Sequence, residues 1–439
     1  MNGADLLASL PDGWRRVPLK TTCDFAVSNV DKHSFDDELP VRLCNYTDVY
    51  KNDRVSPDMD LMAATATPQE IERFRLEIGD VVITKDSESW NDIAIPAYIE
   101  GTADDFICGY HLAFIRPRKD VLDGRFLFRC MQSRPVALQL ELEATGVTRY
   151  GLPKDAIGLA VLPLPPLPTQ LRIANYLDRE AARIDGLITE KERMLVLLEE
   201  KRTALISRLV TRGLDPNAPL KPSGQEWLGE IPAHWAIQPI KYLAVVGNGS
   251  TPSVENADYW DDEGYPWLNS SVVNVSPVTD ASRFVTETAL RECHLPKIQP
   301  PAVLVGITGQ GKTRGMAAVL GIEATINQHI AFIKPRSQEL DTEYLCFLLG
   351  HAYAFLRSDS DGAGSTKGAI TCEQLANMKI PVPPSGEQID ICTRIRQSLD
   401  VSKPLRAQIQ CSLDLLTERR SALITAAVTG QIPLEEMTG

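Results

Sequence analysis

Apolar residues along this chain follow two different periods, which alternate twice from one end to the other. Residues 11–160 and 232–378 contain short β-type runs, such as DVVIT at 80–84 and IAFI at 330–333, broken by Gly, Pro, Asn and Asp. After the proline-rich sequences LPLPPLP and IPVPP, apolar residues recur three, four or seven positions apart, which is the spacing of one helix face. The pattern predicts two mainly β domains, each followed by a helical region.

Each helical region carries an apolar seam of the kind that pairs two helices, with charged residues on the other faces. The seam residues are Ile184, Ile188, Leu195, Leu198, Leu205 and Leu209 in the first region and Leu399, Ile409, Leu413, Leu416 and Leu423 in the second. Arg202 and Arg420 share one register on this seam. Either they meet partners across the helix pair or in another subunit, or their stems lie along the seam and their guanidinium groups reach water.

Gly186 and Pro404 stand at equivalent positions of the two helical regions, and both residue types weaken a helix. We therefore expect a short helix, a bend and a longer helix in each region. The longer helix of the first region should run from about Leu187 to Val210.

The alternation arises because one unit occurs twice. The sequence HLAFIRPR at 111–118 reappears as HIAFIKPR at 329–336, an offset of 218 (329 − 111). The same offset aligns LPLPP at 162–166 with IPVPP at 380–384, and Gln170 with Gln388. It also aligns 197–210 with 415–428, where eight of fourteen positions are identical. Self-similarity at a fixed offset marks a tandem repeat.

Two copies of one unit in a single chain can imitate a two-fold dimer, with each helical region packing antiparallel on its counterpart. The longer helix would span roughly 36 Å at ~1.5 Å per residue. That length is close to the roughly 34–36 Å between half-sites one turn apart on B-DNA. We therefore expect an α+β protein in which a long antiparallel two-helix coiled coil separates two β domains with pseudo-two-fold symmetry. Because the β domains have diverged, the two halves of a DNA target should differ.

Composition and charge narrow the function classes. The chain is 44% hydrophobic and 23% charged, as globular proteins are. No apolar run approaches the ~18 residues of a membrane span and no secretory signal opens the chain, so we expect a cytoplasmic protein. The nine cysteines form no CxxC pair and the six histidines show no metal-ligand spacing, so we expect no metal site. The net charge of −13 opposes DNA binding unless a local basic face or partner subunits grip the phosphates.

The junction between the two copies carries a distinctive motif. The sequences GLDP at 213–216 and KPSGQEWLGEIPAHW at 221–235 resemble the junction between the halves of type I restriction-modification specificity subunits. Gln170 with the preceding prolines, the Ile184–Asp185 cluster and EKRTALI at 200–206 resemble the first conserved helical region of that family. The second copy keeps Gln388 and ERRSALI at 418–424 but loses the Ile-Asp cluster at 402–404. The resemblance spans the chain and is weakest in the β domains.

The resemblance implies two target-recognition domains, at 1–160 and 216–378, and two conserved helical regions, each a hinge plus a long helix, at 161–215 and 379–439. It implies a non-catalytic subunit that recognises a bipartite, asymmetric site on double-stranded DNA in a defence against foreign DNA. The implied partners are two methyltransferase subunits, which use S-adenosylmethionine for adenine methylation, and restriction subunits, which use ATP and magnesium, where these are present. No cofactor is expected in this chain.

Polar and cationic loops supply the candidate DNA contacts. GVTRY at 146–150 and GSTKG at 364–368 share one register, and such a Gly, hydroxyl, cation sequence suits phosphate or base-edge contact; the alternative is a solvated turn. The candidates are Tyr46, Thr47, Lys85, Ser87, Trp90, Asn91, Thr148, Arg149 and Tyr150 in the first domain and Asn269, Ser270, Ser271, Gln310, Lys312, Thr313, Arg314, Thr366 and Lys367 in the second. The repeated His111 and His329 are more typical of structural hydrogen bonding than of catalysis.

The main rival function is that of an NTPase, because GITGQGKT at 306–313 matches the phosphate-loop motif after an apolar run. That motif requires a following helix whose N-terminus binds the phosphates. Residues 314–321, RGMAAVLG, instead predict a strand leaving a hairpin. A methyltransferase is disfavoured because no GxGxxG-like cofactor loop or Asn/Asp-Pro-Pro-aromatic motif occurs. A helical scaffold without DNA contact would explain the acidity but not the duplicated β domains.

Overall fold

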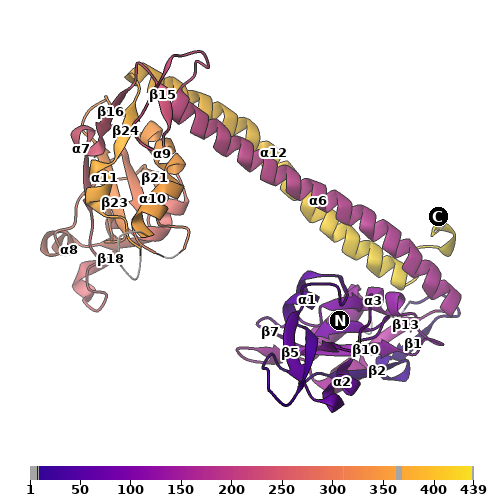
Figure 1. Cartoon of the computed structure of the whole chain (residues 1–439). Helices are drawn as coiled ribbons and strands as arrows, with labels where there is room; N and C mark the ends of the chain where they lie inside the picture. Colours follow the sequence, from indigo (N-terminus) through magenta and orange to yellow (C-terminus); the bar gives the residue numbers. More distant parts are fainter. Residues whose placement is uncertain (1–6, 8, 310, 362–367, 438–439) are drawn as a thin grey trace. The chain divides into compact units, whose positions relative to one another are not determined.

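The computed structural model describes residues 7, 9–309, 311–361 and 368–437, and the chain divides into two compact units. Unit 1 comprises Met1–Arg193 with Gln410–Gly439, and unit 2 comprises Met194–Ile409. Each unit contains one β domain, the start of one long helix and the end of the other (Figure 1). The four consecutive domains expected from the sequence stay a prediction.

The β domain of unit 1 is built on a five-stranded sheet with the order β2–β10–β6–β8–β4. These strands are β2 (Cys23–Val27), β4 (Arg54–Val55), β6 (Val81–Thr84), β8 (Pro96–Ile99) and β10 (Leu112–Pro117). A second sheet joins β3 (Leu39–Cys44), β5 (Met62–Ala66) and β9 (Phe106–Cys108). Every residue of β6 is buried, as its unbroken apolar run predicts.

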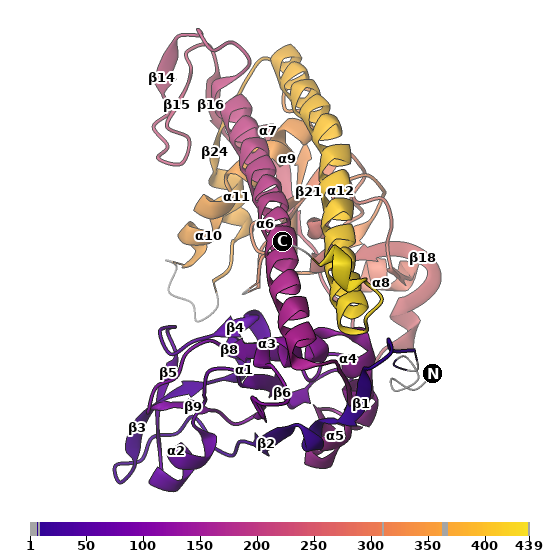
Figure 2. The ribbon, with the colours of Figure 1, turned by 90° about the vertical axis from the view of Figure 1, so that its right-hand side faces the viewer.

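Shorter elements complete this domain. The strand β1 (Arg15–Pro18) pairs with β13 (Val161–Leu164), and β7 (Asp86–Ser87), β11 (Thr145–Gly146) and β12 (Tyr150–Gly151) form a small sheet. The helices are α1 (Tyr46–Lys51), α2 (Pro68–Phe74), α3 (Gly124–Gln132), α4 (Arg134–Glu143) and α5 (Lys154–Leu159), with the 3-10 turn η2 (Leu19–Thr21). In the turned view, α3 and α4 lie next to the start of α6 (Figure 2).

The β domain of unit 2 repeats this plan. Its main sheet has the order β17–β23–β20–β21, with β17 (Ala244–Asn248), β20 (Ala302–Gly306), β21 (Ala317–Leu320) and β23 (Ile330–Pro335). The remaining strands are β14 (Leu220–Pro222), β15 (Glu230–Pro232), β16 (Ala236–Pro239), β18 (Trp260–Leu268), β19 (Arg283–Val285), β22 (Thr325–Ile326) and β24 (Lys379–Val382). The helices are α7 (Ile240–Leu243), α8 (Glu287–Glu292), α9 (Thr342–His351), α10 (Tyr353–Asp361) and α11 (Cys372–Asn377), with the 3-10 turns η3 (Ala257–Tyr259) and η4 (Ser270–Asn274).

The sequence offset of 218 reappears in the structure. It relates β10 to β23, β13 to β24, α5 to α11 and the start of α3 to the start of α9. The pairings repeat as well, because β10 pairs with β2 and β6 just as β23 pairs with β17 and β20. The predicted tandem repeat of a mainly β domain is therefore confirmed.

The long helices differ from the expectation at both weak points. The helix α6 (Leu167–Arg212) runs for 46 residues through Gly186, and α12 (Ser385–Val428) runs for 44 residues through Pro404. The predicted break into a short and a longer helix was wrong, as was the predicted start near Leu187. A glycine costs a helix about 1 kcal/mol and an interior proline about 3 kcal/mol. Apolar residues on either side of these positions, such as Ile184, Ile395 and Ile409, are buried, and helices in proteins are stabilised mainly by such packing.

The predicted seam residues form the inward faces of α6 and α12. None of the thirteen side chains assigned to the seam is classed as exposed, and Ile184, Leu209, Ile409 and Leu413 are buried. Apolar residues off the seam, such as Val196 and Leu415, are 58% and 60% exposed. The helices lie side by side in both views (Figures 1 and 2).

The two seam arginines behave differently. Arg420 of α12 donates from Nε to Asp185 Oδ1 of α6 at 2.7 Å, so the partner expected across the helix pair is present in unit 1. Arg202 instead donates to Glu199 of its own helix at 3.2 Å, although Glu199 also contacts Arg406 of α12. The position equivalent to Asp185 is Lys403 (403 − 185 = 218). The carboxylate that pairs with Arg420 is therefore replaced by a cation at the position that would pair with Arg202.

These two ion pairs also show that the helices are antiparallel. The α6 residue that lies later in the chain, Glu199, pairs with the α12 residue that lies earlier, Arg406.

A glutamine at the equivalent position of each unit fixes the long helix to its β domain. Gln170 is fully buried; its Oε1 accepts from the Asp123 backbone N–H at 2.9 Å, and its Nε2 donates to the carbonyls of Val121 and Pro165 at 3.0 and 2.9 Å. Gln388 makes the same three bonds in unit 2, at 2.8 Å each. The repeated Gln thus positions the residue that caps α3 or α9, since Asp123 and Asp341 accept from the N–H of Phe126 and Tyr344.

Replacing Gln170 by Ala should lower the free energy of unfolding by roughly 2–4 kcal/mol, because three buried backbone groups lose their partner. Urea denaturation of the full chain measures this change. Gln410→Ala is the matched control, since Gln410 is exposed and bonds only to Asp414 on the same helix. A loss for Gln170→Ala no larger than that of the control would contradict the role assigned to the buried amide.

Candidate nucleic-acid interface

In the first β domain the polar candidates gather around the small sheet of β7, β11 and β12. Tyr150 of β12 pairs with Ser87 of β7, which brings the two predicted segments into direct contact. The turn between β11 and β12 carries Thr148 and Arg149, both exposed. In this domain the segment GVTRY, which shares its register with GSTKG, therefore forms a solvent-facing hairpin.

A histidine links this hairpin to the main sheet. His111 Nδ1 lies 2.6 Å from Asp86 Oδ2 and 3.2 Å from Arg149 Nη2. Its backbone has a φ of 72°, a left-handed conformation that is uncommon for a residue with a side chain. The carboxylate can only accept, so the shorter contact makes His111 Nδ1 a donor to Asp86, and the Arg149 guanidinium lies beside this pair at the surface. The repetition of the histidine is visible in the sequence, whereas its pairing with Asp86 is visible only in the structure.

Aromatic side chains surround this cluster. Tyr46 and Tyr50 stack with ring centroids 5.4 Å apart, and the Lys85 ammonium lies 4.7 Å from the ring centroid of Tyr110. Tyr50, Trp90 and Tyr110 are 43%, 43% and 44% exposed. Partial burial is the main cause that raises the pKa of Tyr46, while a hydrogen bond with Ser87 and the nearby Arg149 oppose the rise. The hydroxyl of Tyr46 is therefore a neutral donor and acceptor beside a cation.

The other candidates of this domain lie around the same surface with unequal access. Thr47 and Asn91 are exposed, and Asn91 Oδ1 accepts from Ser89 at 2.6 Å. Ser87 is only 7% exposed, so its side chain is better placed to hydrogen-bond with Tyr46 than to contact a ligand.

In the second β domain the equivalent histidine has different partners. His329 Nδ1 lies 2.7 Å from Thr308 Oγ1, and Gln328 Nε2 lies 3.3 Å from His329 Nε2. Gln328 Oε1 also accepts from Thr251. Among the described residues, His329 thus contacts a hydroxyl and an amide where His111 contacts Asp86 and Arg149.

The remaining candidates of the second domain fall into two places. Asn269 caps η4, because its Oδ1 accepts from the Ser271 backbone N–H at 2.9 Å; Ser271 is exposed, and Ser270 lies between them. Lys312 is exposed, Thr313 is partly buried, and the backbone of this loop accepts bonds from Tyr353 and Arg357 of α10.

Arg314 differs from the expectation, because its side chain is buried, with 3% exposed. That leaves it without the surface that a direct contact to DNA requires. Gln310, Thr366 and Lys367 lie outside the described residues.

The phosphate-loop match lacks the structure that the motif requires. Gly306 ends β20, and the chain returns as β21, which pairs antiparallel with β20 from Ala302 to Val305. The Gly315 N–H donates to the Gly306 carbonyl at 2.8 Å across this hairpin. A strand follows the motif where a nucleotide-binding loop opens a helix, so the hairpin predicted from the sequence is confirmed.

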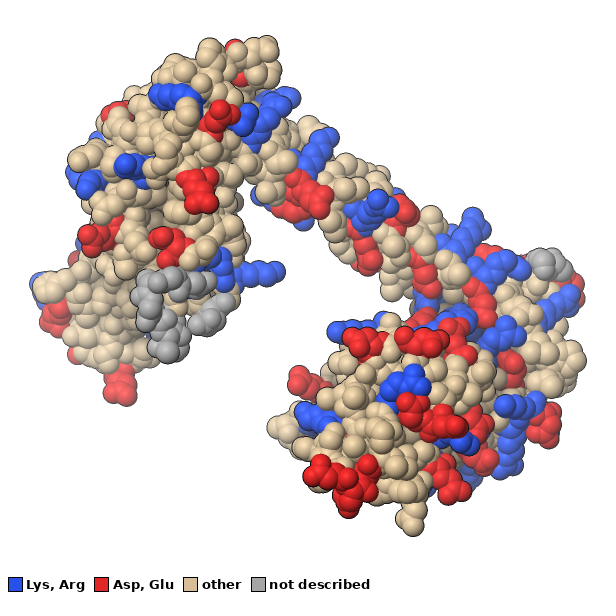
Figure 3. All heavy atoms as spheres, viewed as in Figure 1, with Lys and Arg blue, Asp and Glu red and all other residues tan. Residues whose placement is uncertain are grey.

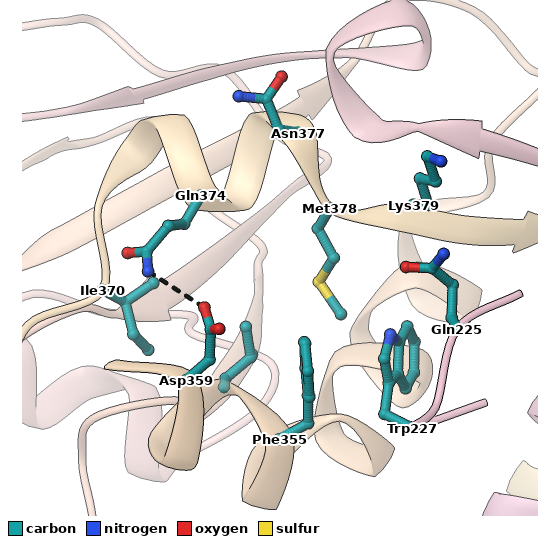
Figure 4. Close-up of a pocket in the computed structure, with 10 residues that line it drawn as sticks. Gln225, Trp227, Phe355, Asp359, Ile370, Gln374, Asn377, Met378 and Lys379 are labelled. Atoms are coloured by element: carbon teal, nitrogen blue, oxygen red, sulfur yellow. Dashed lines mark hydrogen bonds between the residues drawn. The ribbon is translucent and has the colours of Figure 1, made fainter. Parts of the chain in front are cut away.

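The junction motif serves to pack unit 2. Trp235 is fully buried and donates from Nε1 to Glu387 of α12 at 3.0 Å. Trp227 stacks on Phe355 with ring centroids 5.7 Å apart, at the side of a pocket of about 280 Å³ that Figure 4 shows. Gln374 and Asp359 bond to each other at its polar side. The tryptophans of the motif are therefore packing residues.

Acidic and basic side chains are interspersed on the face that Figure 3 shows, including the exposed sides of the long helices. Within the part of the chain that the structure describes, no group of three or more His, Cys, Asp and Glu residues could hold a metal ion. Among the described helices, none is long and apolar enough to cross a membrane.

Comparison with known proteins identifies related sequences. Residues 232–410 match the family model of the type I restriction modification DNA specificity domain. The putative MjaX specificity subunit of Methanocaldococcus jannaschii is 22% identical over 83% of this chain and 81% of its own length. The EcoKI specificity subunit of Escherichia coli is 19% identical over 96% of this chain and 90% of its own length.

Two solved structures share the fold. A chain from a study of complex assembly and conformational transition in the type I restriction-modification system aligns with a TM-score of 0.70 and 18% identity, over 97% of this chain and 100% of that one. The crystal structure of the HsdS subunit from Thermoanaerobacter tengcongensis aligns with a TM-score of 0.51 and 19% identity, over 97% and 98% of the two chains. The chain is therefore similar over most of its length to the specificity subunits of type I restriction-modification systems, and residues 232–410 match their DNA specificity domain.

Proposed function

We propose that this subunit recognises a bipartite, asymmetric site on double-stranded DNA, with one half read by each β domain. The observation that carries the proposal is that the equivalent histidines of the two β domains contact different polar side chains among the described residues. In the first domain His111 joins an acidic and a cationic partner, and in the second His329 joins a hydroxyl and an amide. Two unlike sets of donors and acceptors favour two unlike half-sites.

The chemistry of the first cluster suits recognition of base edges. The Arg149 guanidinium presents a planar set of donors, which pairs best with the O6 and N7 acceptors of guanine or with phosphate oxygens. The guanidinium lies beside the His111–Asp86 pair, so a carboxylate and a ring adjoin the donors that would meet a base or a phosphate. The exposed rings of Tyr50, Trp90 and Tyr110 offer apolar contact next to it.

The long helices are the proposed docking site for two methyltransferase subunits. Large apolar side chains on them face solvent, among them Leu187, Val196, Leu197, Val401 and Leu415. Exposed apolar side chains repeated along one element are typical of a protein interface. Because the helical region occurs twice, it favours two copies of one partner. S-adenosylmethionine would be bound by these partners, and ATP with magnesium by restriction subunits where the host encodes them.

Mapping of methylated adenine in the host genome should show a split, asymmetric motif that depends on this gene. A deletion strain should lose methylation at that motif alone, because the specificity subunit supplies the sequence recognition. Sequencing that detects modified bases in the two strains makes the comparison. A continuous or palindromic motif, or a methylation pattern unchanged by the deletion, would contradict the proposal.

In the reconstituted complex, Arg149→Ala should weaken binding to the mapped site by roughly 1–3 kcal/mol if the guanidinium contacts a base. The loss should be concentrated at one half-site, since Arg149 lies in one β domain. Arg118→Ala in the same domain is the control, because Arg118 is half exposed and pairs with Asp24 at 3.3 Å. Binding assays with duplexes altered in one half at a time measure the effect. Equal affinities of the two variants would remove Arg149 from the interface.

A further inference from the structure

Two consecutive residues of the first β domain contact both long helices at once. Arg54, the first residue of β4, donates from Nη2 to Asp178 Oδ1 of α6 at 3.0 Å. Its neighbour Asp53 accepts from Arg420 of α12. Arg420 in turn bonds to Asp185 of α6. Arg54 also pairs with Glu100 of its own domain. The contacts of Asp53 and Arg54, here called the clasp, with Arg420 and Asp178 can nevertheless both form only while α6 and α12 lie together.

The clasp is part of a larger ionic cluster on unit 1. The Asp178 carboxylate also accepts from Arg129 Nη2 at 2.9 Å and from Arg125 Nη1 at 3.4 Å, both on α3. The Arg129 side chain is only 4% exposed, and burial lowers its pKa while the bond to Asp178 opposes that change. A carboxylate shared by three guanidinium groups at low exposure is held more firmly than a surface ion pair.

The second unit has a single ion pair at the equivalent place, and its charges are reversed. Arg396 of α12 stands where Asp178 stands in α6 (396 − 178 = 218), and Glu343 of α9 stands where Arg125 stands in α3 (343 − 125 = 218). The two side chains are 3.5 Å apart, and Arg396 is 56% exposed. Water and salt screen such a pair, so it contributes little to the attachment of the second domain.

We propose that the clasp is a positioning element that couples the orientation of the first β domain to the paired state of α6 and α12. The complex would then reject a DNA site whose gap between half-sites has the wrong length chiefly through this domain. Asp53 and Arg54 touch no DNA in this role; they act through Asp178 and Arg420. The inference rests on the proposed recognition of a bipartite site.

The test compares methylation of duplexes that carry the mapped motif with its native gap and with a gap one base pair longer or shorter. The complete methyltransferase complex is used, with the double variant Asp53→Asn and Arg54→Gln. This variant leaves Asp178 paired with Arg125 and Arg129 and leaves Arg420 paired with Asp185. It also removes the pair between Arg54 and Glu100, both of which are partly exposed, so we expect the fold to be retained. We expect discrimination between native and altered gaps to fall by roughly tenfold, within the usual range of coupling between sites.

The control is Arg396→Gln, which removes the equivalent but exposed pair of unit 2 and should leave gap discrimination within about twofold of the wild type. Unchanged discrimination in the clasp variant, or an equal loss of rate on all gaps together with lower thermal stability, would overturn the inference. If the double variant does not fold, Arg54→Lys is used instead, because it keeps the charge but not the planar set of donors. This variant should lower gap discrimination in part. Unchanged discrimination would overturn the inference. Failure of the proposed function is distinct, because the wild-type complex would then methylate without regard to either half-site.

Discussion

Each β domain completes its hydrophobic core with the ends of two different helices. In unit 1, Ile173 and Leu177 from the start of α6 are buried with Ile424 and Val428 from the end of α12. In unit 2 the start of α12 and the end of α6 contribute the equivalent residues, among them Ile395 and Val210. Neither half of the sequence can bury these faces alone, so the exchange of helix ends makes the two β domains parts of one structure.

Because each β domain packs on these helix ends, charge differences between the repeats show which side chains fix each domain to its helices. Asp185 and Lys403 are equivalent in sequence, yet the first pairs with Arg420 and the second cannot pair with Arg202. Asp178 and Arg396 differ in sign in the same way, and their partners on α3 and α9 differ accordingly. Each domain is thus matched in charge to its own helix, while the apolar contacts beneath are shared. Domains that are alike in fold and individually fixed to their helices suit the proposed recognition of two unlike half-sites.

Much of the fold follows from the sequence because it depends on repeated and periodic features. The apolar run at 80–84, the offset of 218 and the seam from Ile184 to Leu209 predict the buried strands, the duplication and the inward helix faces. The predicted helix break failed because intrinsic preferences at Gly186 and Pro404 are small against burial that is spread over a whole helix.

The candidate site was less predictable, because it depends on contacts between distant segments. Nothing in the local sequence places Asp86 and Arg149 against the repeated His111, or distinguishes the buried Arg314 from the exposed Lys312 two positions earlier. The partner of Arg420 was similarly open until Asp185 and Asp53 were located. The fold follows from the apolar periodicity and the repeat in the sequence. The polar clusters depend instead on how elements far apart in the chain align with one another.

If each β domain reads its own half of the DNA target, replacing one domain must change one half of the methylated motif. The most direct measurement maps the methylated motif of a variant in which residues 232–378 are replaced by a second copy of residues 11–160. Arg396 is changed to Asp in this variant so that it can pair with the incoming Arg125, as Asp178 does. Separate recognition by the two domains predicts that the asymmetric motif becomes an inverted repeat of the half read by the first domain. A motif that keeps its second half unchanged would contradict it.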